Sequence, residues 1–310
     1  MSLRRAFSTV LAGALAVASF AGLGTTADAA RSPDPSTATL RQLARPIGLR
    51  IGTAVDTSAL TDDSTYRRLV GQQFSNVTPE NVMKWEVVEP ARGQFDFTEA
   101  DELVAFARAH NQKVRGHTLV WHNQLPSWLT SGTWTRAQLR AILRQHIFTE
   151  VGHFRGQIRE WDVVNEAIDD NGELHDTFWL RNLGPGYIAD AFRWAHQADP
   201  KAILFYNDYN IEGINAKSDA VYALVKQLKR QGVPIEGVGV QGHLSTRYGL
   251  PENMQQNLHR FAELGLKTAV TEADVRIDLP VEAAEVQAQS AAYSYMLESC
   301  LLERSCISFT

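Results

Sequence analysis

The chain has 310 residues, of which 44% are hydrophobic and 21% charged, and its formal net charge is −5. This is the composition of a globular protein with enough chain to bury a large core. The acidic balance and the lack of a basic run or stripe argue against nucleic acid as a partner, whereas a neutral polymer is compatible with this charge.

Residues 1–30 have the features of a secretion signal. Arg4 and Arg5 form a basic start, an apolar run covers residues 10–23, and Ala27-Asp28-Ala29 is typical of a cleavage site. The alternative is a membrane anchor, but the run is short for a bilayer and contains two glycines. We therefore expect a secreted, extracellular protein that has no membrane partner.

Residues 31–45 are rich in proline, serine and threonine, which is typical of a short linker or arm. The remaining residues, 46–310, are expected to form one catalytic domain. The chain has two cysteines, Cys300 and Cys306, and an exported protein meets an oxidising compartment. We expect a disulfide between them, with two unpaired thiols as the alternative.

Short apolar strands alternate with longer stretches of helical period along the whole domain. The expected strands cover residues 50–55, 74–77, 113–119, 160–164, 202–206, 237–241 and 267–271. The expected helices cover residues 62–72, 98–111, 135–154, 187–198, 215–231, 252–264 and 281–302, the fourth one placed after Pro185-Gly186 because that pair breaks a helix.

This alternation predicts a parallel sheet with right-handed crossovers, which eight units close into a (β/α)8 TIM barrel. An open, doubly wound sheet is the alternative. No glycine-rich phosphate loop follows the first strand, and polar residues follow many strands rather than one switch point, so the barrel is favoured.

The eighth strand is expected at residues 306–310. In this interpretation the barrel is incomplete at its C-terminus, with the eighth strand only begun and the last helix absent. We therefore expect this chain, expressed as written, to have low stability and weak activity.

Polar side chains gather at the C-terminal end of six strands, which is where active sites form in such barrels. Two of these ends carry a glutamate: Trp161-Asp162-Val163-Val164-Asn165-Glu166 and Val270-Thr271-Glu272-Ala273-Asp274. A pair of carboxyl groups is the minimal equipment for cleaving a glycosidic bond, one as proton donor and the other as nucleophile or base. A structural salt bridge at a strand end is the alternative for either residue.

Five motifs together resemble family 10 glycoside hydrolases, the endo-β-1,4-xylanases. They are Asn-Val-Thr-Pro-Glu-Asn-x-Met-Lys-Trp, Gly-His-Thr-Leu-Val-Trp-His, Trp-Asp-Val-Val-Asn-Glu, Tyr-Asn-Asp-Tyr-Asn and Thr-Glu-x-Asp, and the similarity runs from residue 50 to residue 310. The resemblance implies a retaining endo-xylanase without a cofactor that acts on xylan and xylo-oligosaccharides, and we expect a monomer. A related barrel glycanase acting on another β-glucan, and an inactive xylan-binding fragment, are the alternatives.

The resemblance also assigns roles. It implies that Glu166 is the acid/base, that Glu272 is the nucleophile, and that Asn165 binds the 2-hydroxyl of the sugar at the cleavage point. His243 is expected to orient Glu272, with Asp274 behind its imidazole. Further residues match sugar-binding positions beside the bond: Glu80, Asn81, Lys84, His117, Trp121 and Gln241.

Four more positions complete these assignments. Tyr209 and Asn210 match the leaving-group side, where a ring can stack on a sugar face, and Asp162 and Asp208 are expected to hold other site residues in place. Trp85 is either a core residue or a neighbour of the site. The histidines do not have the spacing of a metal site, so no metal is expected.

Overall fold

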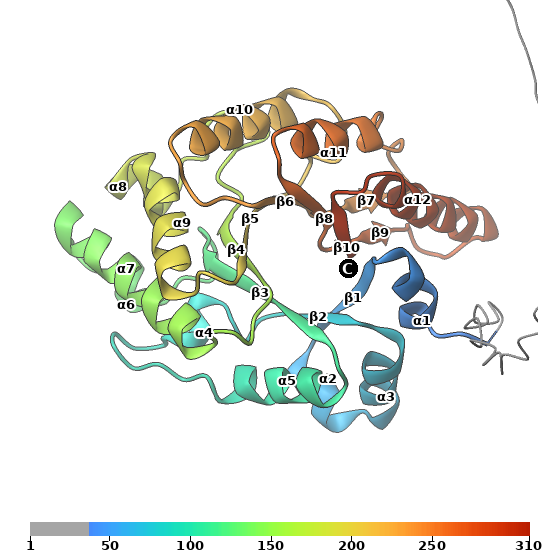
Figure 1. Cartoon of the computed structure of the whole chain (residues 1–310), viewed down its shortest axis with the longest axis horizontal. Coiled ribbons are helices and arrows are strands. Elements are labelled where there is room, and N and C mark those ends of the chain that lie inside the picture. The colour runs from blue at the N-terminus through green and yellow to red at the C-terminus, as the bar shows by residue number, and fades with distance from the viewer. Residues whose placement is uncertain (1–36) are drawn as a thin grey trace, which may run out of the picture.

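The computed structural model describes residues 37–310, in which eight parallel strands form a closed barrel in the order β1-β10-β8-β6-β5-β4-β3-β2 (Figure 1). The predicted barrel is therefore confirmed, and the open sheet is excluded. The barrel strands are β1 (Arg50–Val55), β2 (Asn76–Pro79), β3 (Lys113–Val120), β4 (Glu160–Asn165), β5 (Ile203–Asp208), β6 (Gly237–Val240), β8 (Lys267–Val270) and β10 (Cys306–Phe309).

Seven longer helices surround the barrel, close to the ranges that the apolar period predicts (Figure 1). They are α3 (Ser64–Gln73), α5 (Thr98–Ala109), α7 (Arg136–His153), α9 (Gly186–Ala198), α10 (Ala216–Arg230), α11 (Met254–Glu263) and α12 (Ala283–Leu301). Within residues 37–310, none of the helices is both long enough and apolar enough to cross a bilayer.

The sequence did not predict the shorter helices, because three to six residues carry too little periodicity. They are α1 (Leu40–Ala44), α2 (Thr57–Asp62), α4 (Trp85–Val88), α6 (Ser127–Thr130), α8 (Phe178–Leu183) and the 3₁₀ turn η1 (Arg45–Ile47). The expected break before the fourth long helix is present, since Pro185 is the N-cap of α9 and α8 ends before it.

The N-terminal segment divides into two parts. The predicted signal, residues 1–30, lies outside the described residues, as does the start of the segment expected to be a linker. Residues 40–44 of that segment are helical, because the side chain of Gln42 accepts a hydrogen bond from the backbone nitrogen of Thr39 at 2.8 Å. Arg41 then anchors this helix by donating to the carbonyl oxygen of His110 at 2.9 Å.

A small two-stranded sheet stands beyond the barrel. Its strands β7 (His243–Ser245) and β9 (Asp274–Arg276) are parallel, and each follows a barrel strand after two or three residues. Their register places His243 opposite Asp274. The backbone pairing thus holds these two residues side by side at the C-terminal edge of the barrel.

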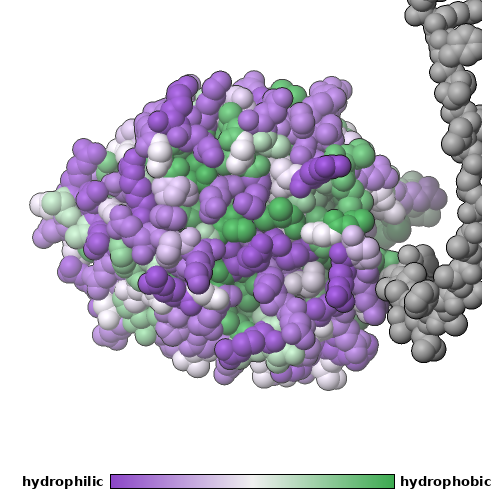
Figure 2. Space-filling model, viewed as in Figure 1, coloured by the Kyte–Doolittle hydropathy of each residue, from purple (hydrophilic) through white to green (hydrophobic). Residues whose placement is uncertain are grey.

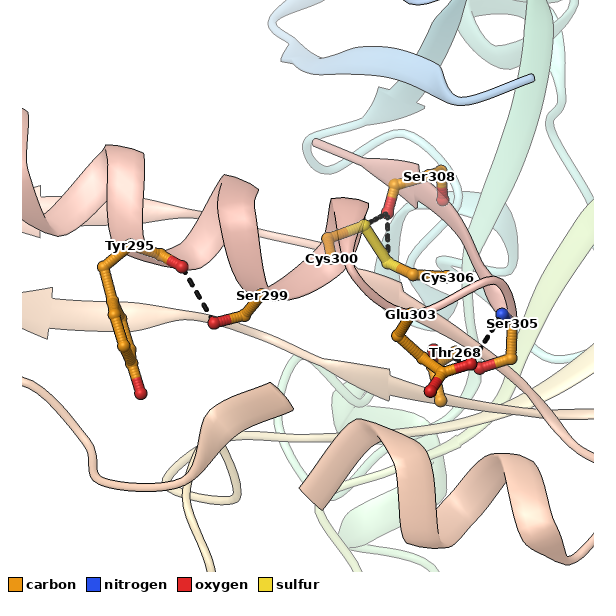
Figure 3. The surroundings of a disulfide bond; sticks show 8 residues. All are labelled: Thr268, Tyr295, Ser299, Cys300, Glu303, Ser305, Cys306 and Ser308. Atoms are coloured by element: carbon orange, nitrogen blue, oxygen red, sulfur yellow. Dashed lines mark hydrogen bonds between the residues drawn. A yellow bond between two sulfur atoms is a disulfide. The ribbon is translucent and has the colours of Figure 1, made fainter. Parts of the chain in front are cut away.

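β10 closes the barrel by pairing with β1 on one side and with β8 on the other. A disulfide joins Cys300 at the end of α12 to Cys306 at the start of β10, with 5.3 Å between the Cα atoms (Figure 3). Beside it, Glu303 accepts a hydrogen bond from the backbone nitrogen of Ser305 at 2.9 Å (Figure 3). The predicted disulfide is confirmed, and it fixes the turn that leads into the closing strand.

Large buried side chains such as Trp161, Trp179 and Phe205 fill the interior. In the space-filling view, hydrophobic residues gather toward the middle of the visible face and hydrophilic residues dominate its rim (Figure 2). Where the strands begin, Arg50 forms an ion pair with the fully buried Glu160. This charged pair lies at the opposite end of the barrel from the polar strand ends described next.

Candidate active site

The C-terminal edge of the barrel brings both predicted glutamates together with their expected partners. Glu166 directly follows β4, and Glu272 follows β8 after Thr271. All barrel strands run in the same direction, so these ends meet at one edge. The side-chain amides of Asn165 and Asn207 link the two carboxyl groups through hydrogen bonds.

Neutral donors surround the carboxylate of Glu166. Trp121 Nε1 donates to Oε2 at 2.7 Å, while Asn165 Nδ2 and Gln241 Nε2 donate to Oε1 at 3.1 and 3.0 Å. The backbone of Glu166 has a φ of 57°, in the left-handed region that non-glycine residues seldom adopt. Its amide nitrogen donates to the carbonyl oxygen of Asn207 at 2.9 Å, which holds this conformation.

Glu272 lies instead among histidines. Its Oε2 is 3.3 Å from His243 Nε2, and its Oε1 is 4.0 Å from His117 Nδ1. Burial alone would raise the pKa of Glu272, but the nearby His117 and His243, together with a hydrogen bond from Asn207, lower it to about 2. This side chain is therefore an anion at neutral pH.

His243 itself is held between two carboxylates. Its Nδ1 contacts Asp274 Oδ2 at 2.8 Å, on the far side of the ring from Glu272. Hydrogen bonds to Asp274 and Glu272 raise the pKa of His243 to about 10, against the opposing effect of burial. The imidazole is consequently cationic at neutral pH and donates from both nitrogens, an arrangement that agrees with the predicted placement of His243 and Asp274.

Asn207 is a residue of this edge that the sequence interpretation did not single out. Its Nδ2 donates to Glu272 Oε1 at 2.8 Å and to Asn165 Oδ1 at 2.9 Å. Its Oδ1 accepts from the hydroxyl of Thr271 at 2.8 Å, which fixes the direction of the amide. A Cβ atom at position 239 would lie 2.2 Å from this oxygen, so only glycine fits there. The signal that could have identified Asn207 is its place beside Asp208, where β5 ends in polar residues.

The carboxylate of Asp162 holds the imidazole of His117 in place. Its Nδ1 lies 3.0 Å from Asp162 Oδ2, and the same carboxylate is ion-paired with the buried Arg115. Asp162 thus has the supporting position expected for it. Arg115, which the sequence interpretation did not include, also lies over the ring of Phe205 inside the barrel, 4.5 Å from its centroid.

The residues predicted to bind sugar after β2 are at the same edge. Glu80 and Asn81 are exposed, and Lys84 Nζ contacts Asn81 Oδ1 at 3.3 Å and lies 5.1 Å from the centroid of the Trp121 ring. Burial lowers the pKa of Lys84, and the negative charges of Glu272 and Glu80 oppose that shift. Lys84 is therefore close enough to Glu272 and Glu80 for their negative charges to affect its pKa.

Tyr209 and Asn210, predicted for the leaving-group side, follow β5. Asn210 is exposed and donates to Asp170 Oδ1 at 3.2 Å, while Tyr209 is half-buried. Asp208, expected as a support, accepts from the hydroxyl of Tyr206 at 2.5 Å and from the backbone nitrogen of Tyr209 at 2.9 Å. Burial raises the pKa of Asp208 to about 7.

A groove of about 630 Å³ opens beside these residues. His243, which contacts Glu272, lies on its wall, so the groove adjoins the paired glutamates. Its other lining residues include Asp170, Asn210, Glu212, Lys217 and Tyr248. The mixture of amide, carboxylate, ammonium and aromatic groups suits a ligand rich in hydroxyl groups.

Two residues near the predicted motifs have other positions. Trp85 is buried: its ring stacks on His146 with centroids 3.6 Å apart, and its Nε1 donates to Glu89 at 2.9 Å. It is a core residue rather than part of the site wall. His122 Nε2 lies 3.9 Å from Glu166 Oε2, and burial lowers the pKa of this histidine.

Comparison with known proteins gives one consistent result. The sequence model of glycosyl hydrolase family 10 matches residues 39–310. Endo-1,4-beta-xylanase B of Thermotoga neapolitana is 44% identical over 265 residues, 84% of this chain and 77% of the relative. Endo-1,4-beta-xylanase of Agaricus bisporus is 42% identical over 261 residues, with 84% and 78% covered. Xylanase 10B of Thermotoga petrophila RKU-1, solved in complex with xylobiose, has a TM-score of 0.85 at 43% identity and covers 87% of this chain and 84% of its own.

Proposed function

The chain belongs to glycosyl hydrolase family 10, and from this we propose that it hydrolyses internal β-1,4-xylosidic bonds of xylan with retention of anomeric configuration. Glu272 is the nucleophile and Glu166 the acid/base. The observation that carries the assignment of roles is the contrast in the groups that hydrogen-bond the two glutamates: the cationic His243 and an amide contact Glu272, whereas an indole and two amides donate to Glu166. The xylobiose bound to a similar xylanase supports xylo-oligosaccharides as ligands.

In the first step, Glu166 donates its proton to the glycosidic oxygen while the Glu272 carboxylate attacks the anomeric carbon. The bond to the leaving sugar breaks and a covalent glycosyl-enzyme forms. Because the pKa of Glu272 is about 2, the attacking group is ionised in advance. Asn165, whose amide is held by Glu166 and Asn207, has the fixed orientation needed to bind the 2-hydroxyl as positive charge develops.

In the second step, the ester has lost the negative charge of Glu272, and Glu166 is now the base. It takes a proton from water, whose oxygen forms the new bond to the anomeric carbon as the bond to Glu272 breaks. Two inversions give net retention. Carboxyl groups about 5–5.5 Å apart go with this outcome, and about 6.5–9.5 Å with inversion.

The test uses the purified protein with xylan, carboxymethylcellulose and xylotetraose. We expect reducing ends from xylan but not from carboxymethylcellulose, and β-configured products first in a proton NMR time course. Replacing Glu272 by alanine should lower kcat on xylan by about 10⁴-fold or more. Replacing the exposed Glu99 by glutamine, as a control, should leave kcat unchanged.

The variant Glu166→Ala separates the two roles. With an aryl xylobioside, whose leaving group needs no proton, the glycosyl-enzyme should still form, and azide should restore turnover of Glu166→Ala with a β-xylobiosyl azide as product. First products of the α configuration, or equal loss from Glu99→Gln, would contradict the assignment.

We also propose that the protein is secreted and acts as a monomer. The signal-like features of residues 1–30 and the disulfide between Cys300 and Cys306 support export, since disulfides persist in oxidising compartments. N-terminal sequencing of protein recovered from the culture medium is the test. Intact residues 1–30 on the recovered protein would contradict this proposal.

A further inference from the structure

Lys217 is a buried cation beside the predicted leaving-group side that the mechanism above does not use. It lies in the first turn of α10, and its side chain is 3% exposed. Its ammonium nitrogen is 3.1 Å from Asp208 Oδ1, 3.2 Å from Asp170 Oδ1 and 3.2 Å from the centroid of the Tyr209 ring. One ammonium group therefore joins the loops after β4 and β5 to α10.

Two of these contacts limit the movement of Tyr209. The ammonium lies over the ring face, where the electron density of the π system attracts it. Its partner Asp208 accepts a hydrogen bond from the backbone nitrogen of Tyr209 at 2.9 Å, so the backbone and the ring of that residue are held through the same ion pair.

The burial of this charge is balanced locally. Burial works against the ammonium, but Asp208 raises the pKa of Lys217 above its ordinary value. A buried ammonium without partners would be costly, and here two carboxylates and an aromatic ring compensate for the lost water. Lys217 also lines the groove of about 630 Å³ beside His243, so it lies where a ligand on that side would pass.

We infer that Lys217 is a positioning residue that holds the Tyr209 ring as a platform for the sugar on the leaving-group side, and thereby sets how well a sugar hydroxyl competes with water for the glycosyl-enzyme. This inference rests on the proposed function. When a sugar is the acceptor, its hydroxyl oxygen bonds to the anomeric carbon, the bond to Glu272 breaks and the hydroxyl proton passes to Glu166. The water reaction is the same step without a ring on the platform.

The experiment measures this competition. An aryl β-xylobioside is the donor, xylobiose is the added acceptor, and chromatography gives the ratio of transfer product to hydrolysis product. In Lys217→Met the ratio should fall about tenfold, because a loosened ring loses on the order of 1.4 kcal/mol of acceptor binding. Release of the phenol without acceptor should change far less.

The ratio does not depend on the fraction of folded enzyme, so a merely structural role would leave it unmoved. Lys217→Gln is measured as well, so that poor folding of the methionine variant does not end the test. Glutamine can still hydrogen-bond Asp208 but has no charge over the Tyr209 ring, so its ratio should also fall by more than twofold. Arg50→Met is the matched control, since it removes the cation of an ion pair at the opposite end of the barrel. Its ratio should equal that of the wild type.

A ratio within twofold of wild type in either folded Lys217 variant would overturn the inference, and so would an equal fall in Arg50→Met. Absence of phenol release by the wild-type enzyme is a different result, because it would refute the proposed function itself.

Discussion

The two glutamates lie at the same edge of one barrel, yet their surroundings differ in kind. The carboxylate of Glu272 contacts the cationic His243, which Asp274 holds from behind. That of Glu166 accepts hydrogen bonds from an indole and from two amides, none of which can carry a charge. Two acidic residues of the same type thus have different hydrogen-bond partners, one cationic and the others neutral.

This difference gives a physical reason for the proposed division of roles between the two glutamates. A group that must attack as an anion is stabilised in the charged form, and formal positive charge near it does this most strongly. A group that must both give and take a proton is better served by neutral donors, which hold its geometry without fixing its charge. Asn207 belongs to both settings, because its side chain contacts Glu272 and its carbonyl holds the backbone of Glu166.

Replacing Asn207 by aspartate should remove the difference between the surroundings of Glu272 and Glu166, and we expect it to have the largest effect of the three variants below. A carboxylate would then stand about where an amide now donates to Glu272 at 2.8 Å. We expect kcat/KM on xylan to fall by about 10³-fold, the upper range for loss of one oriented donor. Like charge raises a carboxyl pKa, so the acidic limb of the pH profile should move to higher pH. An unshifted limb, or a loss below tenfold, would show that Asn207 does not position Glu272.

Replacing His243 by glutamine should remove the charge but keep a donor. The pKa of Glu272 is about 2 with the imidazolium in place, so losing this cation should raise it. The acidic limb of kcat/KM should move upward, with a loss of rate of about 10²-fold at neutral pH. The effect should shrink above pH 10, where the wild-type imidazole itself loses its proton. A loss that is independent of pH would favour a role in packing alone.

Replacing Trp121 by phenylalanine should have the smallest effect. This variant changes the surroundings of Glu166 instead of those of Glu272. It deletes a neutral donor, 2.7 Å from Glu166 Oε2, and leaves the histidines around Glu272 in place. We expect kcat/KM on xylan to fall by about tenfold, while the acidic limb of the pH profile stays where it is. A shift of that limb as large as the one in His243→Gln would contradict the separation of the two settings.

The sequence was sufficient to predict the barrel, its long helices and the glutamate pair, because period and motif are local signals. All eight barrel strands and seven long helices lie within a few residues of the expected ranges. Short helices such as α8 were not predicted, and the helix at residues 40–44 replaces part of an expected linker. In both cases a few capping contacts determine the structure, and such contacts leave no trace in the hydrophobic periodicity of the sequence.

The candidate site shows the same limit. Glu166 and Glu272 lie inside two of the motifs, were predicted, and lie at the expected edge of the barrel. Asn207 was not singled out although it lies inside the Tyr-Asn-Asp-Tyr-Asn motif, because its importance depends on contacts with residues 42 and 65 positions away. Lys217 lies outside the motifs, and its contacts join three separate elements. Trp85 shows the converse: a motif neighbour whose ring is in the core.

The left-handed backbone of Glu166 has a consequence for improving this protein. A non-glycine residue held at a φ of 57° costs on the order of 1 kcal/mol, which a glycine would recover. Glycine would at the same time remove the hydrogen bonds that the Glu166 carboxylate accepts, and with them the proposed proton donor, so heat resistance and activity are set by different properties of this one residue. Any laboratory evolution of this chain should score hydrolysis in the same round as thermal survival.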